Sequence, residues 1–141
     1  MNEQEIRQAM STLEVFRAQL ESITQNQQLV QMSLEELGRA KETLTQYQKA
    51  AEGDELLVPI GGNSFVFAKV ASTDKAIVGV GTGISVERSM DDAIKTMDDR
   101  AAELIDSMKK LTDRRMMIEE QASTLSQVVE RELQALQQYR G

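Results

Sequence analysis

Two long segments of this chain repeat apolar residues at alternating steps of three and four, and this repeat restricts the fold more than any other feature. The first repeat runs from Ile6 to Ala51, and the second runs from Met90 to Tyr139. A period of 3.5 residues sustained over such lengths is typical of coiled-coil helices. The one proline of the chain, Pro59, lies outside both repeats. We therefore expect two long helices, over residues 1–52 and 89–141, that pack along a narrow apolar seam.

The two repeats are nearly equal in length and flank a short insert, so the simplest fold is an antiparallel two-helix coiled-coil hairpin within a single domain, residues 1–141. Aromatic residues make up only 4% of the chain, and tryptophan is absent. That composition suits a narrow seam better than the wide core of a compact globule. Antiparallel pairing of the seams places Gln27 opposite Arg115. A polar layer of this kind fixes the register at some cost in stability.

The insert, residues 53–88, predicts two β-hairpins. Its four candidate strands cover residues 55–60, 64–70, 76–80 and 84–88, and the segments between them read "GGN", "ASTDK" and "GTG", which is turn chemistry. Pro59 cannot donate a ladder hydrogen bond, so its strand is expected at an edge or at a bulge. Ser89, with Asp92 three residues later, is a capping-box variant that marks the start of the second helix.

The glycines of the insert are expected to serve turns. Gly79, Gly81 and Gly83 do not complete a dinucleotide-binding fingerprint, because the last position of that pattern holds Ile84, and a P-loop pattern is absent from the sequence. The stretches "FVFA" and "AIVGV" place apolar side chains on both faces of their strands. Four short strands also leave open edges and little core. We therefore expect the insert to be an assembly region, covered by other chains, from which the helices project.

Several function classes are disfavoured by composition. The chain holds 23 acidic and 16 basic residues, a net charge of −7, which argues against a phosphate-backbone partner. It contains neither cysteine nor histidine, which removes the thiolate and the commonest general base and metal ligand. We expect no catalytic residues, no metal, no cofactor and no enzymatic activity. The absence of a signal-peptide pattern and of a long apolar run predicts a cytoplasmic protein that binds neither membrane nor nucleic acid.

Apolar residues off the seam leave two interpretations open. Met10, Val15, Val128 and Leu133 gather near the end of the hairpin that is furthest from the insert. Adaptable side chains in such a place suit loose apolar contact with other proteins, or simply further packing between helices. A second off-seam group, further along the helices, leaves the same choice and comprises Leu29, Met32, Met116 and Met117. The basic group Lys109, Lys110, Arg114 and Arg115 suits either an acidic partner or a solvated helix face.

The order of these segments is similar to that of a known family. A heptad helix, "ELLVPIGGNSFVFAKV", "AIVGVGTGISVERSMDDAI" and a second heptad helix together resemble the alpha-type subunits of archaeal prefoldin, over essentially the whole chain. The most specific parts are "VPIGGNSFV" and "VGVGTGISVE"; two hairpins in the insert also favour the alpha type. The resemblance implies an ATP-independent chaperone subunit that captures unfolded or nascent proteins with its coiled-coil tips and delivers them to a group II chaperonin.

The resemblance also implies partners and site residues. Two alpha-type and four beta-type subunits would form a hetero-oligomer, a hexamer whose β-hairpins assemble into a β-barrel platform. The assembly interface would comprise Leu56, Val58, Ile60, Phe65, Phe67, Val70, Ile77, Val78, Val80, Ile84 and Val86. The client-binding tip would comprise Ile6, Met10, Leu13, Phe16, Val129, Leu133, Leu136 and Tyr139. The tip positions rest on location and chemistry, since the family has no strict motif there.

Two other classes of function compete with this expectation. The coiled coil could be a structural spacer or tether that separates its partners without holding clients. An aggregation assay with an unfolded client and no nucleotide distinguishes that reading from the chaperone. A nucleotide-dependent enzyme that uses the glycine run ranks far below both, because the chain lacks the Walker pattern as well as histidine and cysteine.

Overall fold

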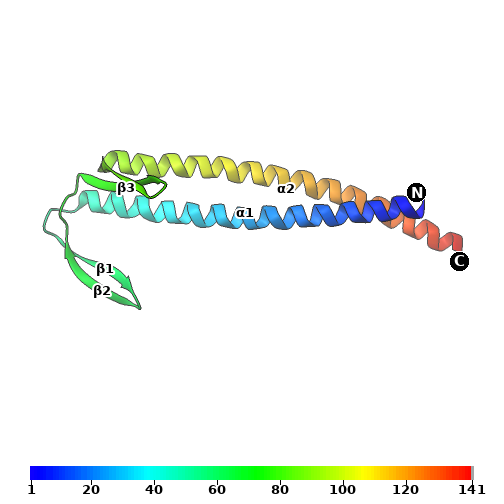
Figure 1. Ribbon diagram of the computed structural model, residues 1–141, viewed down its shortest axis with the longest axis horizontal. Helices are drawn as coiled ribbons and strands as arrows, with labels where there is room; N and C mark the ends of the chain where they lie inside the picture. Colours follow the sequence, from blue (N-terminus) through cyan, green and yellow to red (C-terminus); the bar gives the residue numbers. More distant parts are fainter. Residues whose placement is uncertain (141) are drawn as a thin grey trace. The chain divides into compact units, whose positions relative to one another are not determined.

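The computed structural model describes residues 1–140, with side chains through Tyr139, so Gly141 of the expected second helix lies outside the described residues. Along the chain, two β-hairpins follow one long helix and precede another (Figure 1). The elements are α1 (Glu3–Lys49), β1 (Glu55–Gly61), β2 (Ser64–Lys69), β3 (Lys75–Gly81), β4 (Ile84–Ser89) and α2 (Met90–Arg140). The expected fold, long heptad helices joined by two hairpins, is confirmed.

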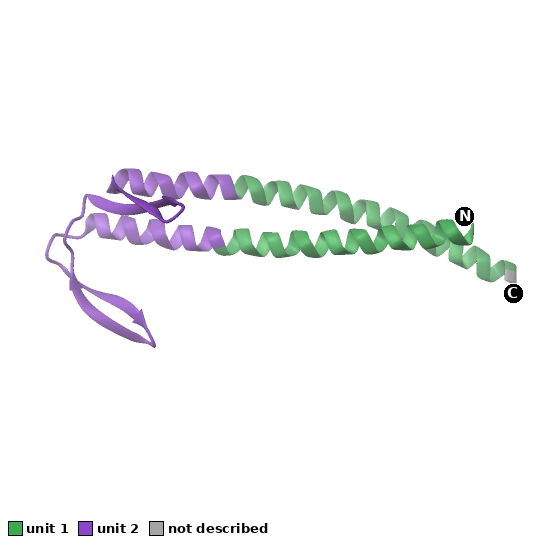
Figure 2. Ribbon diagram, in the orientation of Figure 1, with its two compact units in different colours: residues 1–32, 105–141 green, residues 33–104 purple. Residues whose placement is uncertain are grey.

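The chain divides into two compact units, which are shown in different colours in Figure 2. Unit 1 comprises residues 1–32 and 105–141, and therefore contains the first part of α1 and the last part of α2. Unit 2 comprises residues 33–104, with the end of α1, both hairpins and the start of α2.

The core of unit 1 is the seam between its two helical segments. Ile6, Ala9 and Val129 form a buried apolar cluster near the termini. Ile23 and Ile118 are buried further along the same seam. The partly buried side chains that pack against the cluster are Leu13, Leu125 and Leu136. All of these residues are heptad positions, so the side chains that the 3.5-residue repeat assigns to the seam are the ones that are buried.

Unit 2 holds two separate antiparallel sheets of two strands each. In the first, Leu57 pairs with Phe67, and the pairing shifts between Pro59 and Gly61. The expected irregularity at Pro59 is therefore confirmed. The turn that joins β1 to β2 has Gly62 and Asn63 with φ of 59° and 57°. Two successive residues with positive φ characterise the type I′ hairpin turn, which matches the twist of the strands.

The second hairpin lies against helices of its own unit. Val78 on β3 is 2% exposed, and Ala93, near the start of α2, is 0% exposed. Arg100 of α2 donates a hydrogen bond from its Nη2 atom to the carbonyl of Gly79 on β3. The Met90 amide donates to the carbonyl of Asp74 over 2.8 Å, which fixes the hairpin to the first residue of α2.

The start of α2 has the expected cap. The Ser89 side-chain oxygen accepts a hydrogen bond from the Asp92 amide over 3.1 Å, which satisfies one of the unpaired amides of the first turn. Asp91 and Asp92 lie in this turn, where negative charge is favoured by the helix dipole. Neither helix contains, within residues 1–140, a segment apolar and long enough to cross a lipid bilayer.

Candidate functional site

The first candidate surface is the end of unit 1 that carries both termini. Of the eight predicted tip residues, Ile6 and Val129 are buried in the cluster described above, and Met10, Leu133 and Tyr139 are exposed. The other three are partly buried and comprise Leu13, Phe16 and Leu136. The structure thus brings most of these residues together, with an apolar seam inside and apolar side chains at its surface.

Two hollows open on the surface of unit 1 beside this seam. One is lined by Ile6, Leu133 and Leu136 together with polar residues of the same turns. The other is lined by Phe16, Met117, Leu125 and Val128, with polar groups from the neighbouring turns of α2. A hollow lined by both apolar and polar side chains can accept an apolar segment of another protein without strict sequence requirements.

A polar layer interrupts the seam of unit 1 at the predicted position. Arg115 donates from Nε to Oε1 of Gln27 over 3.1 Å, and from Nη2 to the Thr24 hydroxyl. Gln27 in turn donates from Nε2 to the Thr112 hydroxyl over 3.3 Å, and Glu119 forms an ion pair with Arg115 at 3.5 Å. The layer satisfies a cation inside an otherwise apolar seam, which fixes the register of the two helical segments.

The second candidate surface is the first hairpin, β1–β2. Side chains alternate between the two faces of a strand, and both faces here expose apolar groups. Phe67 is 84% exposed on one face, and Val58 is 37% exposed on the other. The remaining exposed apolar side chains of this hairpin are Leu57, Ile60, Phe65 and Val66. An isolated two-stranded hairpin is marginally stable in water, and an exposed apolar surface of this kind is typical of a contact surface.

The remaining predicted assembly residues differ in exposure. Ile77, Val80 and Ile84 are exposed and available to another chain. Val70 and Val78 are buried by their own unit, at 5% and 2% exposure, which differs from the expectation that other chains cover them. Two further predicted positions, Leu56 and Val86, are partly buried. Part of the predicted assembly surface is therefore buried within the chain itself.

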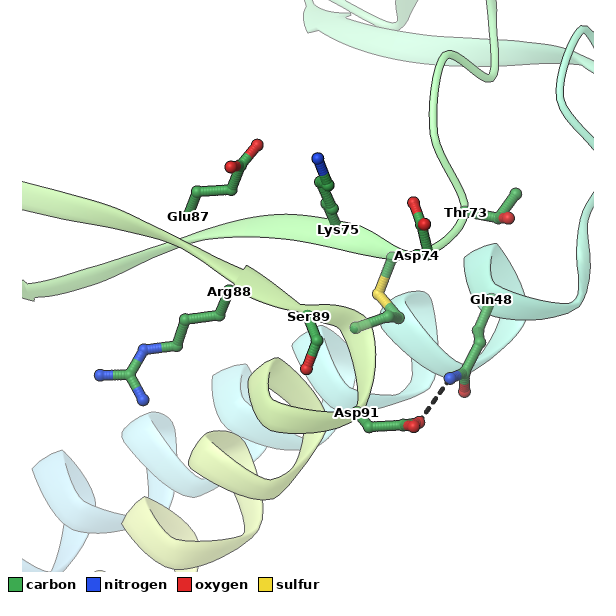
Figure 3. A pocket seen from close by; sticks show the side chains of 9 residues that line it. Gln48, Thr73, Asp74, Lys75, Glu87, Arg88, Ser89 and Asp91 are labelled. Atoms are coloured by element: carbon green, nitrogen blue, oxygen red, sulfur yellow. Dashed lines mark hydrogen bonds between the residues drawn. The ribbon is translucent and has the colours of Figure 1, made fainter.

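A hollow of about 610 Å³ lies where the second hairpin meets the start of α2 (Figure 3). Gln48 of α1 donates a hydrogen bond to Asp91 of α2 over 2.6 Å at its edge. Figure 3 shows Lys75 and Glu87 on the face of the hairpin that turns away from the helices. Charges of both signs line the hollow, so it does not select for a single anion or cation.

The pKa of one carboxyl group in this hollow, that of Asp74, is lowered. The hydrogen bond that the Ser72 hydroxyl donates to Asp74, at 2.6 Å, is the main cause that lowers the pKa of this carboxyl. A backbone hydrogen bond also lowers this pKa, desolvation raises it, and the charge of Lys75 lowers it to a smaller extent. This hydrogen bond joins two residues of the segment that precedes β3.

Some exposed apolar residues were left out of the predicted site sets. Leu57 and Val66 belong to the exposed surface of the first hairpin, and the unbroken apolar run "FVF" already carried that signal for Val66. Ile105 is exposed on unit 1. It directly follows the heptad position Leu104, so the sequence pattern does not distinguish it from a residue that packs beside the seam. The off-seam residues along the helices are also exposed: Leu29, Met32, Met116 and Met117.

Comparison with known proteins gives a consistent result. A family model described as "Prefoldin subunit" matches residues 16–135. The chain is 37% identical over 109 residues to prefoldin subunit alpha of Methanothrix thermoacetophila, covering 77% of this chain and 71% of that protein. It is 30% identical over 128 residues to prefoldin subunit alpha of Methanococcoides burtonii, covering 91% of this chain and 93% of the relative.

Solved structures share the fold. The chain aligns with a chain of filamentous PFD from Methanocaldococcus jannaschii with a TM-score of 0.59 and 26% identity, over 92% of this chain and 98% of the other. It also aligns with the prefoldin beta subunit of Thermococcus strain KS-1 with a TM-score of 0.60 and 16% identity, over 92% of each chain. The latter likeness concerns the fold alone. Together with the heptad helices and paired hairpins, these matches show that the chain belongs to the prefoldin family of chaperone subunits.

Proposed function

We propose that this chain is an alpha-type prefoldin subunit that captures unfolded or nascent proteins without ATP and passes them to a group II chaperonin. The observation that carries the proposal is the termini-bearing end of unit 1, where Met10, Leu133 and Tyr139 are exposed around a buried apolar cluster. Tyr139 is 94% exposed. Apolar surface is therefore already exposed at this end, so client binding would require no chemical reaction.

Capture would use the local stability of the coiled coil. The last turns of a coiled coil have neighbours on one side only, so they open at a lower free energy than the middle of the seam. Opening would add Ile6, Leu13 and Val129 to the surface that is already exposed. Burial of a client's apolar surface against these groups would contribute about 25 cal/mol per Å².

Assembly would allow several weak contacts together to retain a client. Prefoldin subunits assemble with other prefoldin subunits, and we propose a hexamer of two alpha-type and four beta-type chains. Several arms attached to one platform hold a client at high effective concentration, so each contact can remain weak and reversible. Release to the chaperonin then requires no energy source, because no single arm binds tightly. We propose that the protein acts together with these partners in the cytoplasm.

The platform would be built from the exposed apolar residues of the hairpins. We propose Leu57, Val58, Phe65 and Phe67 of the first hairpin and Ile77 of the second as its principal contacts. These side chains are exposed in the free chain and would be buried by strands or helices of other subunits. The net charge of −7 would keep the remaining surface soluble and would oppose uncontrolled association.

A spacer or tether without client-holding activity is the alternative. The discriminating experiment mixes the assembled protein with a chemically unfolded client, dilutes out the denaturant in the absence of nucleotide, and follows light scattering. The chaperone predicts suppressed aggregation at near-stoichiometric amounts, whereas a spacer leaves the scattering curve of the client unchanged. Addition of ATP should change neither result.

A further inference from the structure

Methionine is the only sulfur-bearing side chain of this sequence, and it is unevenly distributed. The chain contains eight methionines and no cysteine. Residues 33–89, which include both hairpins, contain no methionine. The exposed large apolar side chains of the hairpins are leucine, isoleucine, valine and phenylalanine. A peroxide therefore finds no sulfur to attack in the proposed assembly surface.

Exposure divides the methionines of the two helices. Met10, Met32, Met116 and Met117 are exposed on unit 1, whereas Met90, the first residue of α2, is only 2% exposed. The remaining methionines are Met1, which is exposed, and the partly buried Met97 and Met108. An oxidant in solution has to reach the sulfur, so the exposed group reacts before Met90.

Two of the exposed methionines lie on the surface proposed to hold clients. Met10 directly follows Ala9, a member of the buried cluster near the termini. Met117 lines a hollow of about 680 Å³ together with the predicted tip residue Phe16 and with Leu125. Met116 is exposed to a similar extent as Met117, 62% against 58%, but its side chain is not one of those that line the hollow.

Oxidation changes the chemistry of such a side chain. Hydrogen peroxide transfers one oxygen atom to the thioether: the O–O bond breaks, an S–O bond forms, the sulfur loses two electrons, and water leaves. The product, a sulfoxide, is polar, so its burial against an apolar client segment costs free energy unless a hydrogen-bond donor meets it. The adaptable apolar contact that the thioether offers is then lost.

We propose that Met10 and Met117 are oxidation sites at which a peroxide weakens client capture and leaves assembly intact. Both sulfurs lie on exposed apolar surface of unit 1, and the hairpins carry none. The change is reversible by a thiol-dependent reductase, because two thiols take up the oxygen as water and form a disulfide. This inference rests on the proposed function, since it requires a client held at this surface.

Oxidation of this chain alone gives the first measurement. The full chain is treated with dilute hydrogen peroxide, freed of the peroxide, and mixed with an untreated beta-type subunit. Peptide mass spectrometry should find oxygen on Met10 and Met117 before Met90. Native mass measurement should give an unchanged number of subunits, while the suppression of client aggregation falls several-fold. Earlier oxidation of Met90, failed assembly of the oxidised chain, or unchanged protection overturns the proposal.

Two matched variants assign the effect to particular sulfurs. Met10→Leu/Met117→Leu removes two sulfurs and keeps apolar side chains of similar size. Met32→Leu/Met116→Leu is the control, because it removes two exposed sulfurs of the same unit. For each variant, protection after peroxide is divided by its own protection before peroxide. This ratio should stay near unity for the first variant and fall in the control as in the unaltered chain. Equal ratios in the two variants overturn the assignment.

These outcomes separate the inference from the proposed function. If the untreated assembly protects a client and oxidation of Met10 and Met117 changes nothing, only the oxidation sites are refuted. If the untreated assembly does not protect a client, the inference and the proposed function fail together.

Discussion

Arg115 on α2 donates a hydrogen bond from its Nε atom to Oε1 of Gln27 on α1, and the two atoms lie 3.1 Å apart. This contact joins heptad positions that are 88 residues apart in the sequence and places a cation inside an apolar seam. The Thr24 hydroxyl also accepts a hydrogen bond from Arg115. Slippage of one helical segment past the other would leave this charge among apolar side chains, so the layer specifies a single register.

The first prediction concerns this layer. Gln27→Leu alone should lower the free energy of unfolding by about 1–3 kcal/mol, because the Arg115 guanidinium loses an acceptor in a partly buried site. The double variant Gln27→Leu/Arg115→Leu should recover that loss and can exceed the original stability by on the order of 1 kcal/mol. Urea unfolding followed by circular dichroism measures both. A double variant less stable than the single one contradicts the account.

The second prediction concerns the start of α2. Ser89→Ala should lower the free energy of unfolding by about 1 kcal/mol, because the Asp92 amide loses its acceptor. Ser107→Ala is the control, since Ser107 is an exposed serine in the interior of the same helix. That control should be neutral or slightly stabilising by helix propensity. The melting temperatures of the two variants, measured in parallel, test this prediction. An unchanged melting temperature for Ser89→Ala would show that the Ser89 cap does not stabilise the fold.

Much of this fold follows from local patterns in the sequence. The heptad repeat predicts both helices, and the turn residues together with Pro59 predict two hairpins and the irregular pairing. The Gln27–Arg115 layer follows from antiparallel pairing of the seams. The helices, the hairpins and the irregular pairing are local regularities, so they are visible without knowledge of distant contacts. The layer requires in addition only the near-equal lengths of the two repeats, which align the seams.

What the sequence leaves open is which faces the chain itself covers. Val58 pairs with Val66 in the first hairpin as Val78 pairs with Val86 in the second, yet only Val78 is buried. Next to Val78, the Gly79 carbonyl accepts a hydrogen bond from Arg100 of α2, and no pattern in the sequence around Arg100 points to β3. Burial of this kind is decided by how the hairpin turns relative to the helices, a tertiary effect that strand periodicity does not encode.

The third prediction concerns client contact at the exposed side chains. Met10→Gln together with Leu133→Ser should reduce the suppression of client aggregation several-fold while the melting temperature stays nearly unchanged, since both residues are exposed. Leu29→Gln together with Met32→Gln makes the matched comparison at exposed positions further along the helix. Retained protection by this second pair would restrict client binding to the termini-bearing end. An equal loss in both pairs would extend the client surface along the helices.

The fourth prediction concerns pH. The hydrogen bond from Ser72 lowers the pKa of Asp74 below the reference value of 3.8, so the folded state favours the ionised carboxylate. Its stabilising contribution is complete above that reference value and is lost as the pH falls through the lowered folded-state pKa. Ser72→Ala should raise the pKa of Asp74 towards 3.8, which a carboxyl-carbon NMR titration measures directly. A titration curve identical to that of the unaltered chain would show that Ser72 does not cause the shift.

The central claim is that the hairpins assemble the subunits while the termini-bearing end holds the client. Its most direct test is a chain from which residues 1–16 and 129–141 are removed, co-expressed with a beta-type subunit and assayed against an aggregating client without nucleotide. The account predicts an assembly with the same number of subunits by native mass measurement, but with client aggregation as fast as in buffer alone. A truncated assembly that protects the client as well as the complete one would contradict it.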